Sequence, residues 1–145
     1  MKKNSLLKAQ VSVNLPVNLV WDYWTSPAHI QAWNNVDENW HTPLVEIDLK
    51  SGGEFLYRME SKDGTQGFDH QGRYLHVIPY QRIEYELTDG RKSLVEFVEE
   101  IGKTRIIETF DPESKTPLDI QQEFCTSILR NFKNHAETWA ANIQS

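Results

Sequence analysis

The C-terminal part of the chain has the pattern of one long amphipathic helix, predicted over residues 119–143. Apolar residues recur there every four positions, and further apolar residues fall on the flanking rows of the same face. The central row is Phe124, Ile128, Phe132 and Ala136, and the flanking rows hold Cys125, Leu129 and Trp139. A lone helix cannot bury such a stripe, so it needs a concave partner. The pattern therefore predicts a curved sheet that holds this helix.

Short runs of alternating apolar and polar residues precede the helix and predict strands. The predicted strands cover 7–14, 44–49, 54–60, 68–78, 83–87, 95 up to the turn at 100–102, and 104–110. Asp63-Gly64 and Asp89-Gly90 are hairpin signals, and Gly72 inside the longest strand predicts a bend or a bulge. Because tight turns join consecutive strands, the sheet is expected to be antiparallel.

Two short helices are predicted between the first two strands, over 17–24 and 28–33. Ser26 can cap the second helix, with Pro27 as its first helical residue. Residues 34–43 have no clear period and are predicted to form a loop. The order of strand, two short helices, six strands and one long helix predicts an α+β fold. A curved sheet around a long helix tends to leave a space between them, which favours a container.

Length, charge and cysteine content narrow the class of protein. The 145 residues have the length of one domain, so residues 1–145 are expected to form a single unit. A formal net charge of −6 argues against a nucleic-acid partner. There is no apolar run that could span a membrane, and none of signal-peptide length follows the basic start. The lone cysteine, Cys125, is expected to be a buried thiol rather than a nucleophile, and a cytoplasmic protein is expected.

Several segments carry a resemblance to a known family. The matching pieces are 17–21 with Pro27 and Trp33, then Gly-Gly-Glu-Phe at 52–55, Gly-Arg-Tyr at 72–74, 79–83, 95–97 and Thr104-Arg105. Further matches are 37–43 with Trp40-His41, Arg58-Met59, Asp63-Gly64, 67–69 and 108–110. On these residues the chain resembles the START-like (helix-grip, SRPBCC) superfamily. Within it, the chain is similar to a bacterial stand-alone subgroup of the branch named after the activator of the heat-shock protein 90 ATPase.

The resemblance implies a helix-grip fold, in which a curved antiparallel sheet wraps around a long C-terminal helix. The superfamily hosts lipid carriers, hormone receptors, polyketide cyclases and co-chaperones, so it implies the fold more closely than the function. The name of the branch implies a link to chaperones and to stress response. Its true co-chaperones resemble longer chains with an added N-terminal chaperone-binding domain. This chain begins at its first predicted strand, which lowers the expectation of a chaperone contact.

The residues expected to meet a ligand are mostly aromatic and share the inward face of the predicted elements. From the strands they are Phe55, Tyr57, Met59, Phe68, His70, Tyr74, Tyr85, Phe97 and Glu108, and from the helix Phe124, Ile128 and Phe132. Trp33, Trp40 and His41 flank the predicted loop. The resemblance places that loop near a cavity entrance, where these side chains are expected to gate the cavity and contact the ligand. The alternatives are simple core packing of the aromatic residues and a loop pinned by a buried indole.

Glu108 and His70 are the polar residues with inward parity. Glu108 shares a strand face with Thr104 and Ile106, and His70 shares one with Tyr74. A buried carboxylate is costly unless it is paired, and burial raises its pKa. Glu108 is therefore expected to fix a ligand's polar end or to move a proton, and the alternative is a structural hydrogen bond to a Tyr, a Trp or His70. For His70 the alternatives are a catalyst and a histidine satisfied within the fold.

The sequence carries no motif for a metal or a cofactor, so neither is expected. The five histidines lack His-Glu-x-x-His spacing, and Gly52-Gly53 leads into a strand rather than a helix. Three functions remain. The first is a non-catalytic protein that binds a small hydrophobic or amphipathic ligand in an internal cavity. The second is a cyclase- or hydratase-type enzyme with Glu108 or His70 as proton donor or acceptor. The third is a protein-interaction module, linked to a chaperone or forming a homodimer.

Overall fold

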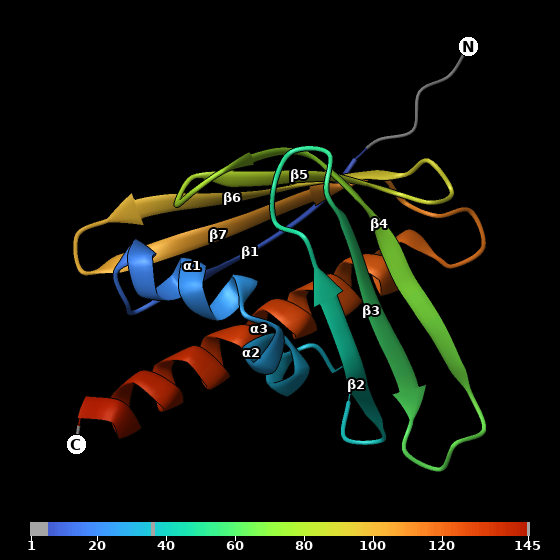
Figure 1. Ribbon diagram of the computed structural model, residues 1–145, viewed down its shortest axis with the longest axis horizontal. Coiled ribbons are helices and arrows are strands. Elements are labelled where there is room, and N and C mark those ends of the chain that lie inside the picture. Colours follow the sequence, from blue (N-terminus) through green and yellow to red (C-terminus); the bar gives the residue numbers. More distant parts are fainter. Residues whose placement is uncertain (1–5, 36, 145) are drawn as a thin grey trace.

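A seven-stranded antiparallel sheet is the frame of the fold (Figure 1). The computed structural model describes residues 6–35 and 37–144. The strands are β1 (Leu7–Val13), β2 (Trp40–Ile47), β3 (Glu54–Ser61), β4 (Gly67–Ile78), β5 (Arg82–Leu87), β6 (Lys92–Glu100) and β7 (Lys103–Phe110). The helices are α1 (Val17–Thr25), α2 (Pro27–Trp33) and α3 (Leu118–Gln144). Strands that follow one another from β2 to β7 are neighbours in the sheet, and β1 pairs with β7 at one edge.

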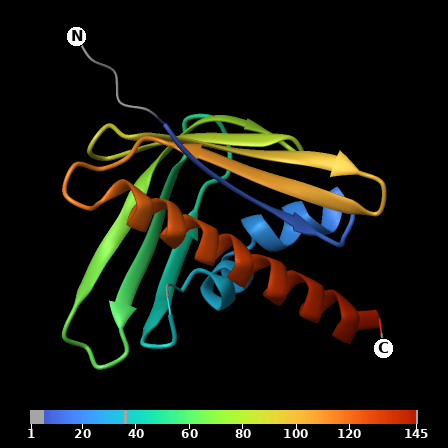
Figure 2. The same cartoon turned by 180° about the vertical axis from the view of Figure 1, so that it is seen from behind.

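The sheet bends so that α3 crosses its concave side, as Figure 2 shows from behind. The strands β2 to β4 point steeply away from β5 to β7 (Figure 1). The helix α1 lies against β6, β7 and α3, and α2 lies against β2 and α3. The predicted fold class, a curved antiparallel sheet around a long C-terminal helix, is confirmed. No helix in the described ranges combines the length and the apolar character that a membrane span needs.

The apolar stripe of α3 is buried along its second half. The buried positions there are Leu129, Phe132, Ala136 and Ala140. The ring of Phe132 meets Trp24 and Trp33 edge-on, with centroids 5.0 and 5.2 Å away. Trp139, predicted on a flanking row of the same face, is 44% exposed. Its ring packs beside α2, 4.9 Å from that of His29.

The second strand begins earlier than the sequence pattern predicts. Residues 34–43 were expected to form a loop, but β2 starts at Trp40, which pairs with Ser61 of β3. A register shift between His41 and Leu44 breaks the alternation of the strand, so its first residues show no period. Pro43 lies inside this strand, which is tolerated because β2 forms an edge of the sheet.

Two local predictions need correction. The irregular pairing of β4 lies between Tyr74 and His76 rather than at Gly72. Gly72 instead allows a close backbone approach, because a Cβ atom there would lie 2.1 Å from the carbonyl oxygen of Glu86. Ser26 occupies the N-cap position of α2, but its side chain makes no capping hydrogen bond within the described structure. The first turn of α2 is therefore favoured by its proline and not by a hydroxyl cap.

Candidate functional site

A cavity of about 520 Å³ lies between the concave face of the sheet and the N-terminal part of α3, and we call it the sheet–helix cavity. Residues from β2 to β7 and from α3 form most of its wall, while α1 and α2 close one end. The apolar wall residues on the sheet include Ile47, Met59, Ile83, Leu87 and Val95, and Leu49 adds to them from just after β2. Most of this lining offers no hydrogen-bond partner, so the few polar side chains in it determine where a polar atom of a ligand can bind.

Aromatic rings on three neighbouring strands form the sheet side of the cavity. Phe55 and Tyr57 both point inward from β3 because residues two apart share a face. Tyr57 pairs with His70 of β4, and their ring centroids are 5.6 Å apart. Phe55 lies edge-on to Tyr85 at 5.1 Å and tilted against Tyr74 at the same distance. These rings form one continuous cluster, which we call the aromatic wall.

Glu108 is, together with Asp111 and Glu113, one of three acidic residues that line the cavity. Its Oε2 accepts hydrogen bonds from the hydroxyls of Ser93, at 3.1 Å, and Tyr85, at 3.3 Å. Among the described residues, its Oε1 accepts a single contact, of 3.6 Å, from the thiol of Cys125 on α3. Burial raises the pKa of Glu108, and the three hydrogen bonds oppose that rise without cancelling it. None of the ion pairs in residues 6–35 and 37–144 includes Glu108.

His70 is held among rings and has no hydrogen-bond partner in the described part of the chain. Burial lowers the pKa of its imidazole to about 4, helped by the positive charge of Arg91 and opposed by Asp89. The side chain is therefore neutral at neutral pH. In the described residues His70 is therefore not a histidine satisfied by a hydrogen bond, and it does not bond to Glu108. The alternative of a structural hydrogen bond between Glu108 and a tyrosine is confirmed, because the hydroxyl of Tyr85 donates to Glu108.

The phenols of the cavity are also neutral. Burial raises the pKa of Tyr57 and Tyr85, and the nearby carboxylate of Glu108 adds to the rise in both. Burial likewise raises the pKa of Tyr74 and that of the Cys125 thiol. A thiol with a raised pKa is a poor nucleophile, which fits the expectation for Cys125.

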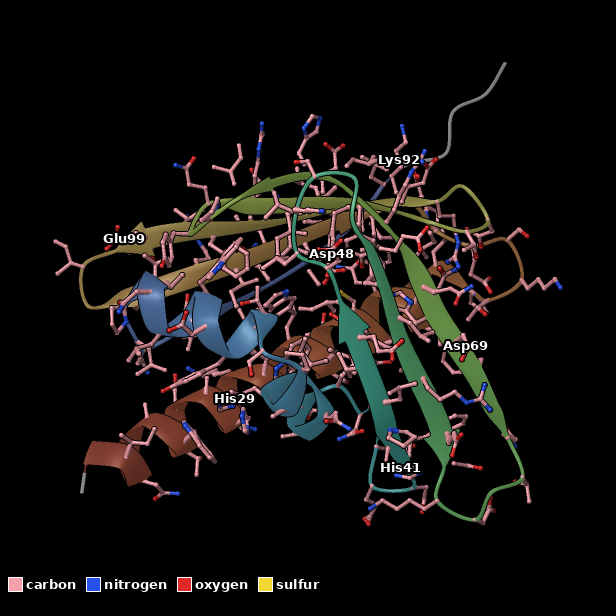
Figure 3. All side chains as sticks on the ribbon, viewed as in Figure 1. His29, His41, Asp48, Asp69, Lys92 and Glu99 are labelled. Atoms are coloured by element: carbon pink, nitrogen blue, oxygen red, sulfur yellow. The ribbon has the colours of Figure 1, made fainter. Side chains whose placement is uncertain are left out.

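The rim of the cavity exposes large apolar side chains. Phe124 and Ile120 of α3 are 52% and 49% exposed, and Phe68 of β4 is 46% exposed, although all three line the cavity. Arg91 and Lys92 lie on the same rim, and Figure 3 shows Lys92 at the start of β6. The opening of the cavity is therefore lined by exposed apolar side chains, with the basic side chains Arg91 and Lys92 beside them.

Most of the candidate ligand residues lie on the cavity wall. They are Trp33, Phe55, Tyr57, Met59, Phe68, His70, Tyr74, Tyr85, Glu108, Phe124 and Ile128. Trp33 also donates its indole N–H to the carbonyl oxygen of Tyr23 at 3.1 Å, so the buried-indole alternative describes it. A contact of any of these residues with a ligand stays a prediction.

Four candidates lie elsewhere, which corrects their expected place at the cavity. Phe132 belongs to the core described above, and Phe97 lies 5.2 Å from the ring of Trp21 in the same core. Trp40 packs against the ring of Phe68 at 6.0 Å outside the cavity lining. His41 lies near the N-terminal end of β2, with its Nε2 3.9 Å from the Glu60 carboxylate of β3 (Figure 3). Trp40 and His41 were misplaced because they belong to a strand and not to a loop over the entrance.

The sequence reasoning missed Ser93 as a partner of Glu108. Ser93 alternates with Val95 and Phe97 along β6, so the parity rule that selected Glu108 also selects this hydroxyl. The contact of Cys125 with Glu108 could not be predicted from the sequence, because it depends on how α3 lies across the sheet. His29 and His135 share a hydrogen bond of 2.8 Å between α2 and α3. Within the described ranges, no three potential metal ligands of the His, Cys, Asp or Glu type come together.

Residues 14–141 match the family described as Activator of Hsp90 ATPase homolog 1-like protein. The chain belongs to this family. The solution structure of the AHSA1-like protein from Aeromonas hydrophila is 34% identical and superposes with a TM-score of 0.85, over 92% of this chain and 94% of that one. A protein from Cytophaga hutchinsonii is 38% identical, with a TM-score of 0.81 over 93% and 94% of the two chains.

More distant structures share the fold. A crystal structure from Nitrosomonas europaea is 20% identical, with a TM-score of 0.80 over 97% of this chain and 99% of that one. The curated proteins contain no significant match to this chain. Family and fold are therefore established, whereas the ligand has to be inferred from the cavity itself.

Proposed function

We propose that the protein binds a small hydrophobic or amphipathic molecule in the sheet–helix cavity, without converting it chemically. The observation that carries this proposal is the cavity of about 520 Å³ with its mostly apolar and aromatic lining. Ligand pockets for small molecules typically measure about 300–1,000 Å³ and combine such a lining with a few polar groups that orient the ligand. Glu108, Ser93 and Tyr85 supply those polar groups at one place in the wall.

The apolar rim supports the same proposal. Phe68, Ile120 and Phe124 expose about half of their surface and line the cavity at the same time. Exposed apolar side chains of this size are costly in water unless a partner or a ligand covers them. A molecule that enters between α3 and β4 would pass over these three side chains. Contact with a chaperone and formation of a homodimer stay predictions.

Filling the cavity tests this function. Ile128 of α3 lines the cavity, so Ile128→Trp is expected to occupy the space that a ligand needs while keeping the helix in place. Ile143 of the same helix is 62% exposed, which makes Ile143→Trp the matched control. Binding of Nile red, an uncharged apolar dye, is measured by its fluorescence. We expect the dye to bind the unchanged protein and Ile143→Trp equally, and Ile128→Trp roughly tenfold more weakly or worse. Equal binding to all three proteins would place the dye outside the cavity and refute the proposal.

A second candidate function is proton transfer to a bound substrate, of the cyclase or hydratase type. The observation in its favour is that Glu108 lies in a mostly apolar cavity and that burial raises the pKa of its carboxyl group. A carboxyl group whose pKa is raised in this way is a better proton donor to a bound substrate than an exposed carboxylate. Glu108→Gln would then abolish turnover while leaving ligand affinity in place. Conversion of a bound ligand that Glu108→Gln leaves unchanged would reject Glu108 as the catalytic group.

A further inference from the structure

The charge distribution of the sheet–helix cavity carries information about its ligand. Glu108 is an acid inside the cavity, and no lysine, arginine or histidine among the described residues forms an ion pair with it. Buried carboxylates in proteins are usually paired or bound to a metal. Glu108 therefore lies in the cavity without a positively charged partner among the described residues.

The carboxylate has a free acceptor position. Oε2 already accepts two hydroxyl hydrogen bonds, from Ser93 and Tyr85. Oε1 accepts only the weak thiol contact of Cys125 at 3.6 Å. A carboxylate oxygen can accept two hydrogen bonds, so Oε1 can take a strong donor from a ligand. The two hydroxyls meanwhile hold the group in a fixed orientation.

The uncharged rings around Glu108 suit a positive charge. The other charged side chains that line the cavity balance one another, with Arg91 and Lys92 against Asp111 and Glu113. His70, Tyr57 and Tyr85 are neutral for the reasons given above, and their rings belong to the aromatic wall with those of Phe55 and Tyr74. Ring faces of this kind attract cations. The guanidinium of Arg91, which lies on the rim, is already bonded to Asp89 at 2.9 Å.

We propose that the natural ligand is an amphipathic amine, whose protonated amino group binds Glu108 Oε1 while its apolar body lies against the aromatic wall. This inference rests on the proposed function, because it names the ligand class of the same cavity. The usual objection to a buried ion pair is the cost of removing both charges from water. Here folding has already removed the carboxyl group from water, so binding has to desolvate the amine and to ionise Glu108 where it is protonated.

The pairing predicts a pH signature. In the empty cavity, burial favours the protonated form of Glu108. An ammonium group beside the carboxylate favours the ionised form, so binding lowers its pKa and releases a proton into solution. Affinity for an amine should therefore rise with pH until Glu108 is ionised in the free protein as well. A neutral ligand of the same shape gains nothing from ionisation and should lack this rise.

A matched series of probes tests the inference. Phenylbutylamine, phenylbutanol and phenylbutyrate share one apolar body and differ in the terminal group, and isothermal titration calorimetry gives their affinities. We expect the amine to bind at least about tenfold more tightly than the alcohol, and the acid to bind most weakly. In Glu108→Gln the preference for the amine should vanish while the alcohol still binds. Glu99→Gln removes the same charge from the exposed far end of β6 and should change none of these affinities (Figure 3).

Proton release keeps the test valid if Glu108→Gln fails to fold. Titrations of the unchanged protein with the amine, in buffers of different ionisation enthalpy, should reveal the released proton, and titrations with the alcohol should not. Equal affinity for amine and alcohol overturns the amine inference and leaves the cavity function standing. Tightest binding of the acid overturns it as well, and points to Lys92 on the rim. If neither the probes nor Nile red bind, the proposed function fails, and this inference fails with it.

Discussion

Replacing His70 by glutamine should make the stability of the protein less sensitive to acid. The folded protein holds the pKa of His70 at about 4, against 6.5 for an unperturbed histidine. As the pH falls below 6.5, the unfolded chain takes up the proton first, so the free energy of unfolding decreases. The loss continues until the folded protein is also protonated near pH 4. Above about pH 7 the full stability is present.

The size of the effect follows from the difference of the two pKa values. The difference is 6.5 − 4 = 2.5 units. At about 1.4 kcal/mol per unit this gives a limit of about 3.5 kcal/mol. Water in the cavity can hydrate the imidazolium, so this figure is an upper value. Glu108 acts in the opposite sense, since its raised pKa makes ionisation at higher pH unfavourable for the folded state. That contribution is the same in protein and variant and cancels in their difference.

Urea denaturation followed by tryptophan fluorescence measures the free energy of unfolding at pH values between about 7.5 and 4. His70→Gln should lose up to about 3 kcal/mol less stability over this range than the unchanged protein. His76 lies on the same strand with its side chain 65% exposed, so His76→Gln is the control. If protein and His70→Gln lose equal stability on acidification, His70 is not held neutral by the fold, and the account of the cavity interior is wrong.

Two further predictions concern packing. Phe132→Ala should cost about 3–5 kcal/mol of unfolding free energy, because it empties a fully buried site. Phe124→Ala on the same helix should cost less than about 1 kcal/mol, because the ring is 52% exposed, and should weaken Nile red binding instead. Equal losses in the two variants would mean that the N-terminal part of α3 is solid core. Gly72→Ala should cost about 2 kcal/mol or more, since its Cβ would lie 2.1 Å from the carbonyl oxygen of Glu86. If Gly72→Ala is as stable as the original protein, the backbones of β4 and β5 can move apart at this position without loss of stability.

The sequence alone was enough to predict the elements whose apolar residues recur with a regular local period. Alternation predicted most of the strands, and recurrence every four residues predicted α3 within about a turn at each end. The same alternation placed Glu108 and His70 on the inward face, because side-chain direction along a strand depends only on parity. The start of β2 was not predicted, because the register shift after His41 breaks the alternation of apolar and polar residues there.

The division of the helix stripe into core and cavity was decided by tertiary structure alone. In the sequence, Phe124, Ile128 and Phe132 are equivalent members of one row. In the fold, Trp24 and Trp33 from the two short helices fill the hollow beside Phe132, so that position is close-packed. At Phe124 and Ile128 the wall residues across the hollow leave space unfilled. Local periodicity specifies which face of an element turns inward, but the volume between facing elements depends on contacts between residues far apart in the chain, which no local pattern records.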